Sequence, residues 1–516
     1  MTRTRLVAAA ERVSAAVDEA ISDLLRRTGP CASVRHLDWA YLRLGTVIST
    51  VRFGSAGAST AMVARSLIED AVMWDWAIAK GVADEFVARS AAAEWHRLRD
   101  LSPHLPWLLP PGTAITTTSF EWLAHPADHL RRLGSGAEEA AVAPLRIAGL
   151  SAVNDVLETF AHCNVVSLFA CPDAGHLPAP LTAAAIHLAG AATAAIASAV
   201  AGPSERLIAE LDASARALAT EASIVHRLPA AASLKQRPNP ARARRLDAVN
   251  ITAQATRFPQ NNRALDDALT NLLQAIGELV ADAVPLMMDS RFSAVAGRLS
   301  VQTLSATAML FRQALAGESA GWNTPFAGRL LVELGGFWGW AQQAVGDGGH
   351  PGQAMRAFAR SAVTNIDRSF RNAGLGATAV DRFLGPAAAF REISDAEDES
   401  IPIPATTDEM LRTGYGDFGG AASRTYRLLS QFAHGTGLGV AHLVEDGNFG
   451  SVSEPMRAVA AAGLALGADQ LAGFPLILAC GLDATTRPRL EPLRHRVTDA
   501  TALVLREVDN TTGIIV

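Results

Sequence analysis

This chain of 516 residues contains few cysteines and tyrosines, and its start does not read as a secretion signal. Its four cysteines are too few and too scattered for a disulfide framework in a chain of this size. Near the start, Glu11 and Arg12 follow a very short apolar run, so the apolar region of a signal peptide is missing. These absences indicate a reducing compartment, and we expect a cytoplasmic protein.

Residues that favour β-strands are also thinly spread. Alanine dominates the composition, tyrosine and the β-branched residues are sparse, and apolar residues recur at spacings of three and four. The apolar share of 49% and the charged share of 19% are typical of a folded globular chain. We therefore predict an all-α protein, and its length predicts more than one domain.

The chain has no strong excess of charge and no clear membrane span. A net charge of −6 and a pI near 6.1 give no global attraction to nucleic acid or to an anionic membrane. Two apolar segments, 181–202 and 456–482, are long enough to resemble spans. The first is mostly alanine and the second is interrupted by Asp469 and Gln470, so we expect buried helices and no membrane partner.

One stretch of sequence nearly recurs within the chain. "ARSLIEDAVMWDWA" at 64–77 aligns with "GRLLVELGGFWGWA" at 328–341, with six identities in thirteen positions from the arginine onward. A second pair of segments, "SAVNDVLETFAH" at 151–162 and "SRTYRLLSQFAH" at 423–434, follows in the same order. A period this long does not fit a solenoid. It predicts two tandem homologous multi-helix domains with pseudo-twofold symmetry.

The junction between the copies is marked by a change in composition. Residues 222–262 hold four prolines and seven Lys or Arg against one Asp. This pattern predicts a linker between copy one at 1–221 and copy two at 263–516. Its basic "KQRPNPARARR" run has two interpretations, contact with phosphate or simply a solvated linker, and the second is the plainer one.

Two local patterns refine this plan. Thr118 with Glu121 and Thr406 with Glu409 each form a Thr-x-x-Glu capping box, which predicts the start of a helix. The apolar spacing across 137–171 predicts one continuous helix.

The repeated tryptophan-bearing stretch also carries paired charges. Its two tryptophans stand two positions apart, so opposite helix faces are aromatic and the helix is expected to be enclosed. Arg65 and Glu69, like Arg329 and Glu333, stand four apart, which places each pair on one face. A buried charge must be paired or face a cleft. The pairs therefore either fix helix packing or line a polar cleft.

A histidine closes each copy of the second segment. Tyr426 and Arg427 precede His434, and the seven-residue step from Arg427 to His434 is two helical turns, so the two share a face. Such a pair can form a site for phosphodiester cleavage, since the imidazole moves a proton and the guanidinium binds the anionic transition state. In copy one, Asp155 replaces the arginine ahead of His162; it can orient an imidazole but would repel phosphate. Packed, hydrogen-bonded histidines are the alternative.

The Arg-x6-His spacing of Arg427 and His434 resembles the Arg-x(4–6)-His signature of HEPN domains, the higher eukaryotes and prokaryotes nucleotide-binding family. "RSLIED" and "YRLLSQFAHG" are also similar to a group of uncharacterised bacterial helical proteins near that family. The resemblance implies paired helical domains whose Arg/His helices face each other. Many members are metal-independent ribonucleases of defence or toxin–antitoxin systems, and inactive members serve as binding or assembly modules. Leu428 follows the arginine here, where HEPN nucleases usually carry a polar residue.

Three functional hypotheses remain open at this point. The first is a HEPN-like module that binds RNA, a nucleotide or a partner protein, in stress or phage defence. The second is a metal-independent ribonuclease that uses Arg427 and His434, assisted by Arg329 and Glu333. The third is a structural or interaction protein whose polar residues stabilise the core.

Motifs for cofactors and metals are missing from the sequence. There is no Walker motif, HExxH or GxSxG, and the glycines after His434 follow a helix rather than a strand. Cys163, Cys171 and His176 lie near His162, but their spacing fits no standard zinc site. We predict neither a cofactor nor a metal.

Overall fold

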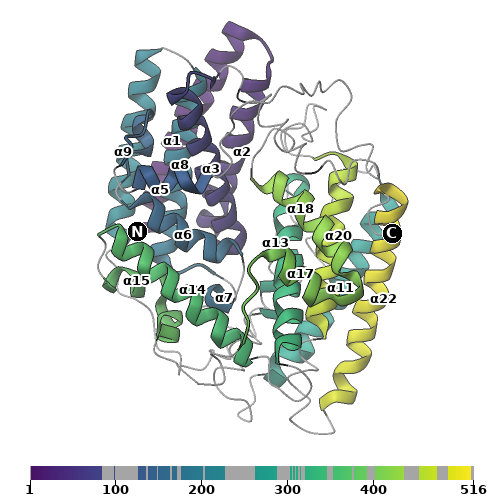
Figure 1. Ribbon diagram of the computed structural model, residues 1–516. Coiled ribbons are helices and arrows are strands. Elements are labelled where there is room, and N and C mark those ends of the chain that lie inside the picture. The colour runs from purple at the N-terminus through teal and green to yellow at the C-terminus, as the bar shows by residue number, and fades with distance from the viewer. Residues whose placement is uncertain are drawn as a thin grey trace.

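A computed structural model shows helices joined by turns and loops, without any β-strand in the described part of the chain (Figure 1). The all-α prediction is confirmed. The described residues are 2–83, 86, 98, 126–134, 137–147, 149–162, 165–170, 176–201, 204–226, 262–287, 303–304, 306–307, 310–311, 314, 320–345, 352–374, 377–391, 401–434, 452–473 and 486–512.

The N-terminal half is a bundle built around α3 and α8. Its elements are α1 (Thr2–Thr28), α2 (Ala32–Phe53), α3 (Ala58–Ala79), α5 (Pro126–Gly134), η3 (Ala143–Leu145), α6 (Leu150–Ala161), α7 (Val165–Ala170), α8 (Ala179–Ala201) and α9 (Glu205–His226). Helix α8 packs against α1, α2, α3 and α9. It is the one described helix that is long and apolar enough to cross a membrane, over Ala179–Val200, yet 78% of that stretch is buried in the protein. Helix α8 is thus a core helix.

The C-terminal half is a second bundle, centred on α13 and α20. Its elements are α11 (Arg263–Met287), α13 (Ala320–Ala344), α14 (Gly352–Asn372), α15 (Ala377–Leu384), η5 (Gly385–Arg391), α17 (Thr407–Tyr415), η6 (Gly416–Phe418), α18 (Gly419–Ala433), α20 (Glu454–Ala472) and α22 (Thr486–Thr512). Helix α13 packs against α17, α18 and α20, and α22 packs against α11 and α20. Apolar residues of both halves belong to one continuous core.

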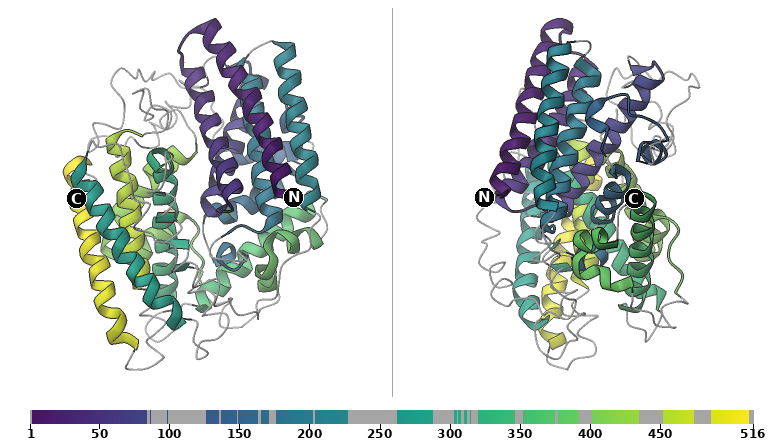
Figure 2. Two further views of the ribbon diagram at one scale, coloured as in Figure 1. Left: turned by 180° about the vertical axis from the view of Figure 1, so that it is seen from behind. Right: turned by 90° about the vertical axis from the view of Figure 1, so that its left-hand side faces the viewer.

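The two halves meet along α3, α13 and α18. Helix α3 contacts both α13 and α18. Beside this contact, Trp39 of α2 lies against Phe432 of α18 and stacks on Phe326 of α13, with ring centroids 5.1 and 6.3 Å away. Helices α14 and α15 follow α13 in the chain but lie below the N-terminal bundle, where α14 packs against α6 and α7 (Figures 1 and 2).

The prediction that the tryptophan-bearing helices are enclosed is confirmed. Trp74 and Trp76 on α3 are 2% and 8% exposed, and Trp338 and Trp340 on α13 are each 4% exposed. Opposite faces of α3 and α13 are therefore both covered.

The expected continuous helix over 137–171 is wrong. The chain forms η3, then α6, then α7, and Gly149, the residue before α6, is in the left-handed conformation with φ 72°. Glycine adopts that conformation without steric cost, and Pro144 in η3 removes a backbone donor. These two residues outweigh the apolar spacing.

The ends of α9 and α11 lie close to the predicted boundaries of the linker. Helix α9 continues to His226, so residues 222–226 of the predicted linker are helical, while α11 begins at Arg263. The basic run lies outside the described residues. Thr406 caps α17 by accepting from the Glu409 amide at 3.2 Å, which confirms the predicted helix start, while the Glu409 side chain accepts from the Ala405 amide at 2.9 Å. Thr118 and Glu121 lie outside the described residues.

Candidate functional site

Each of the two enclosed helices carries the predicted ion pair. On α3, Arg65 Nη2 lies 2.6 Å from Glu69 Oε1, and both side chains are 12% exposed. On α13, Arg329 Nη2 lies 3.8 Å from Glu333 Oε2, and these side chains are 2% and 3% exposed. The i,i+4 spacing brings both pairs together as expected.

The two histidines stand at helix ends and reach across to the other half of the chain. His162 follows the last residue of α6, and His434 follows the last residue of α18. His162 Nδ1 lies 2.5 Å from Glu333 Oε1, and His434 Nδ1 lies 2.5 Å from Glu69 Oε2. Each imidazole therefore pairs with the carboxylate of the opposite half.

The two arginines make a second set of contacts, each within its own half. Arg65 Nη2 lies 3.3 Å from Glu158 Oε1, one helical turn before His162 on α6. Arg329 Nε donates to Ser430 Oγ at 3.1 Å, one turn before the histidine of α18, and Nη2 donates to the Tyr426 hydroxyl at 3.2 Å. The guanidinium also lies over the Tyr426 ring, 5.1 Å from its centroid. Four helices thereby share one polar cluster.

His162 is held between two carboxylates. Glu158 Oε1 lies 3.6 Å from Nε2, on the ring side opposite Glu333. Burial disfavours the charged imidazole, but Glu333 and Glu158 outweigh it and raise the pKa of His162 to about 10. His162 is therefore an imidazolium at neutral pH.

Glu69 and Glu158 are held as carboxylates by Arg65. Burial favours their neutral forms, yet the adjacent guanidinium and the histidines stabilise the charge and lower the pKa of each to about 2. The carboxylates in turn raise the pKa of Arg65 against the effect of burial. The charges of the cluster thus compensate one another.

Arg427, the predicted partner of His434, lies on α18, two helical turns before the histidine. Its side chain on α18 is half-buried, and its charge contributes to lowering the pKa of Asp408 on α17, after larger effects that include burial and hydrogen bonds from Ser423 and Arg412. In the polar cluster described above, the guanidinium groups are those of Arg65 and Arg329, on the two tryptophan-bearing helices. Glu158 and Ser430 were missed by sequence reasoning; their position four residues before each histidine was the available signal.

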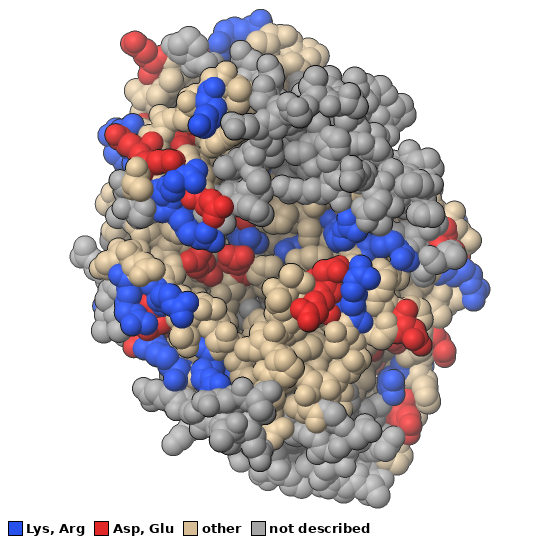
Figure 3. Space-filling view, in the orientation of Figure 1, with Lys and Arg blue, Asp and Glu red and all other residues tan. Residues whose placement is uncertain are grey.

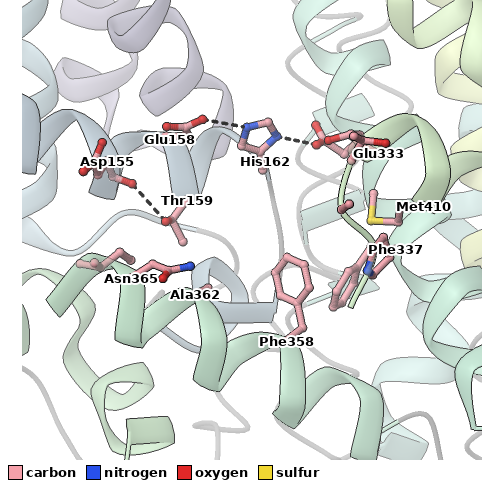
Figure 4. Close-up of a pocket in the computed structure, with 15 residues that line it drawn as sticks. Asp155, Glu158, Thr159, His162, Glu333, Phe337, Phe358, Ala362, Asn365 and Met410 are labelled. Atoms are coloured by element: carbon pink, nitrogen blue, oxygen red, sulfur yellow. Dashed lines mark hydrogen bonds and ion pairs between the residues drawn. The ribbon is translucent and has the colours of Figure 1, made fainter. Parts of the chain in front are cut away.

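A cavity of about 380 Å³ opens beside His162 (Figure 4). Its lining residues come from α6, α13, α14 and the start of α17: Asp155, Glu158, Thr159, His162, Glu333, Phe337, Phe358, Ala362, Asn365, Ile366, Pro404, Ala405, Thr406, Thr407 and Met410. Figure 4 shows His162 and Glu333 near Phe337 and Phe358, with Asp155 and Asn365 further along the cavity. Figure 3 shows acidic side chains near the middle of this face of the molecule.

Metal ligands do not gather in the part of the chain that the structure describes, where no group of three or more His, Cys, Asp or Glu side chains could hold an ion. Cys163 and Cys171 lie outside the described residues, so the cluster considered near His162 is not described.

No protein-family model, curated protein or solved structure matches this chain.

Proposed function

We propose that this protein is a duplicated, HEPN-like helical module of the cytoplasm that binds a small ligand where its two halves meet. The duplication is supported by a parallel plan of contacts. Helix α3 packs against α5, α6 and α8, and α13 packs against α17, α18 and α20. Helices α8 and α1 both pack against α9, and α20 and α11 both pack against α22. The order of the helices in the chain is the same in both sets.

The observation that carries the proposal is the crossed pairing of His162 with Glu333 and of His434 with Glu69, each at 2.5 Å. Each half supplies one Arg, one Glu and one His, but each histidine contacts the glutamate of the other half, so these contacts form only when the two halves dock. Paired HEPN domains also place their polar helices face to face, and here a single chain would provide both partners. The cavity beside this junction gives the cluster access to a ligand.

The charges favour binding over ribonuclease chemistry. Arg65 and Arg329 are both engaged with glutamates. Phosphodiester cleavage needs a positive group free to bind the phosphate, and contacts with RNA come mainly through Lys and Arg. The described lining of the cavity has three carboxylates and neither Lys nor Arg. The phosphates of RNA would be repelled there, so a small ligand fits the site better.

A ligand screen with a blocked cavity tests the proposal. Thermal shift and titration calorimetry would be run with nucleosides, nucleotides, amines, organic acids and sugars on the intact protein and on Ala362→Trp, which fills the cavity from α14. Ala281→Trp, at an exposed site on α11, is the matched control. Binding that is lost in Ala362→Trp and kept in Ala281→Trp supports the proposal. A folded protein that binds none of these compounds favours the purely structural alternative.

A cleavage assay separates binding from catalysis. Total RNA and transfer RNA would be incubated with the intact protein in the presence of a chelator, beside Arg427→Ala and His434→Ala variants shown to be folded by circular dichroism. We expect no cleavage by any of the three. Cleavage by the intact protein that both variants lose would establish the ribonuclease hypothesis and refute the binding role.

A further inference from the structure

Glu333, which lines the cavity beside His162, has one carboxylate oxygen without a hydrogen-bond donor. Glu333 is 2% exposed and contacts His162 through Oε1. Its other oxygen, Oε2, is buried and accepts no hydrogen bond in the described structure, and Arg329 Nη2 is 3.8 Å away. A buried carboxylate oxygen without a donor is costly, so this position favours a ligand that supplies one.

A second carboxylate lies further along the same cavity. Asp155 Oδ2 accepts a hydrogen bond from Ser369 of α14. Burial raises the pKa of Asp155 despite that bond, which shows that the surroundings stabilise its charge incompletely. A positive group in the cavity would stabilise it.

The net charge of the described lining is negative. Asp155, Glu158 and Glu333 supply three carboxylates, and His162 supplies one positive charge. Behind the lining, Arg65 lies 3.3 Å from Glu158 and Arg329 lies 3.8 Å from Glu333, so these two carboxylates are compensated and the charge of Asp155 is the least compensated of the three. In this partly enclosed space, charges interact more strongly than in water.

The remaining wall is apolar and aromatic. Phe337 of α13 and Phe358 of α14 pack edge to face, with ring centroids 5.0 Å apart, and Met410 lines the cavity near them. Aromatic faces attract cations, and an apolar wall of this size binds the hydrocarbon part of a ligand. The described residues offer no metal-binding group, so the complementary cation is organic.

We propose that this cavity binds an organic cation, an ammonium or guanidinium on a small apolar body. Its charged end lies between Asp155 and Glu333, where it donates to a carboxylate, and its body lies against Phe337 and Phe358. This inference rests on the proposed function of the cavity as a ligand site.

Three matched probes test the charge of the ligand. Calorimetric titration at pH 7 would compare 2-phenylethylamine, which is a cation, with the neutral 2-phenylethanol and the anionic phenylacetate. We expect the amine to bind about tenfold more tightly than the alcohol, because it adds a charge-assisted hydrogen bond and a cation–aromatic contact. Phenylacetate should bind most weakly.

Variants locate the effect in the cavity. Asp155→Asn and Glu333→Gln should each reduce the preference for the amine over the alcohol several-fold. Glu139→Gln removes the same charge from a side chain that is 77% exposed and absent from the cavity lining, and should leave the preference unchanged. If Glu333→Gln fails to fold, Asp155→Asn alone decides the test, since its conservative change leaves the cluster around His162 intact.

Failure of the organic-cation proposal and failure of the ligand-site proposal give different results. Three results would overturn the organic-cation proposal but keep the cavity as a ligand site. They are equal binding of amine and alcohol, tightest binding of phenylacetate, and an unchanged preference in folded Asp155→Asn. Absence of binding by all three probes also overturns the cation. The broader screen with Ala362→Trp then decides separately whether the cavity binds any ligand.

Discussion

His162 at the end of α6 contacts Glu333 in the middle of α13 across 171 positions of sequence, at 2.5 Å. The reciprocal contact, between His434 and Glu69, spans 365 positions. Both contacts require that the two halves fold and dock against each other. The polar cluster is therefore a product of the assembled chain, and its stability reports on that assembly.

Glu333→Gln should be strongly destabilising. The change leaves the His162 imidazolium without its buried counter-charge, and we expect a loss of roughly 3 kcal/mol in the free energy of unfolding. Urea denaturation followed by circular dichroism measures it. Glu139→Gln, at an exposed position, should change stability by no more than about 0.5 kcal/mol. A cost for Glu333→Gln as small as that of Glu139→Gln would contradict a role in stability.

Stability should fall at both ends of the pH scale. The lowered pKa of Glu69 and Glu158, about 2, gives stability that is present above their unfolded value of about 4.5 and is lost as the pH falls toward 2. The raised pKa of His162, about 10, gives stability that is present below about 6.5 and is lost as the pH rises toward 10.

Thermal unfolding across this pH range, read by circular dichroism, checks the prediction. His162→Gln should flatten the alkaline limb between pH 6.5 and 10, whereas the same change at His495, an exposed histidine of α22, should leave it in place. An alkaline limb that is equally steep in both variants would show that His162 does not carry it.

Much of the fold follows from spacing that the sequence displays. The paired tryptophans of α3 and α13 predict enclosed helices, and the Arg/Glu spacing predicts the two ion pairs, because both depend only on helix geometry. The break before α6 could not be predicted from apolar spacing alone, because the apolar pattern continues through Pro144 and Gly149, and these two residues interrupt the helix locally.

The site was harder to predict than the helices. The sequence repeat identifies Glu69, Glu333, His162 and His434 as a set, but their pairing depends on how the halves dock, which no local pattern encodes. The Arg427 hypothesis used the shared face of one helix, whereas the arginine that reaches Tyr426 and Ser430 is supplied by α13. The cavity likewise forms only where α6, α13, α14 and α17 come together.

Close packing of α20 on α13 should make two glycines intolerant of a methyl group. A Cβ at Gly463 would lie 2.6 Å from the Gly328 carbonyl oxygen, and one at Gly467 would lie 2.4 Å from the Leu331 carbonyl oxygen. Gly467→Ala should therefore cost about 1–3 kcal/mol, because the two backbones must separate. Gly45, inside α2, has no such neighbour within 4 Å, so Gly45→Ala should stabilise by about 0.5–1 kcal/mol. Urea denaturation distinguishes the two signs, and destabilisation by both changes would contradict the close-packing explanation.

The crossed pairing should appear as a specific coupling energy. In a double-mutant cycle, His162→Asn and Glu333→Gln remove the two ends of one contact, so their combined cost should be smaller than the sum of the single costs by about 1–3 kcal/mol. His162→Asn combined with Glu69→Gln joins residues of the same half, and its coupling should be less than half as large because Glu69 contacts His434 instead. Urea denaturation of the single and double variants gives both values. Equal coupling in the two cycles would mean that the stability of the cluster depends only on its total charge, and that the crossed contacts contribute no specific stabilisation.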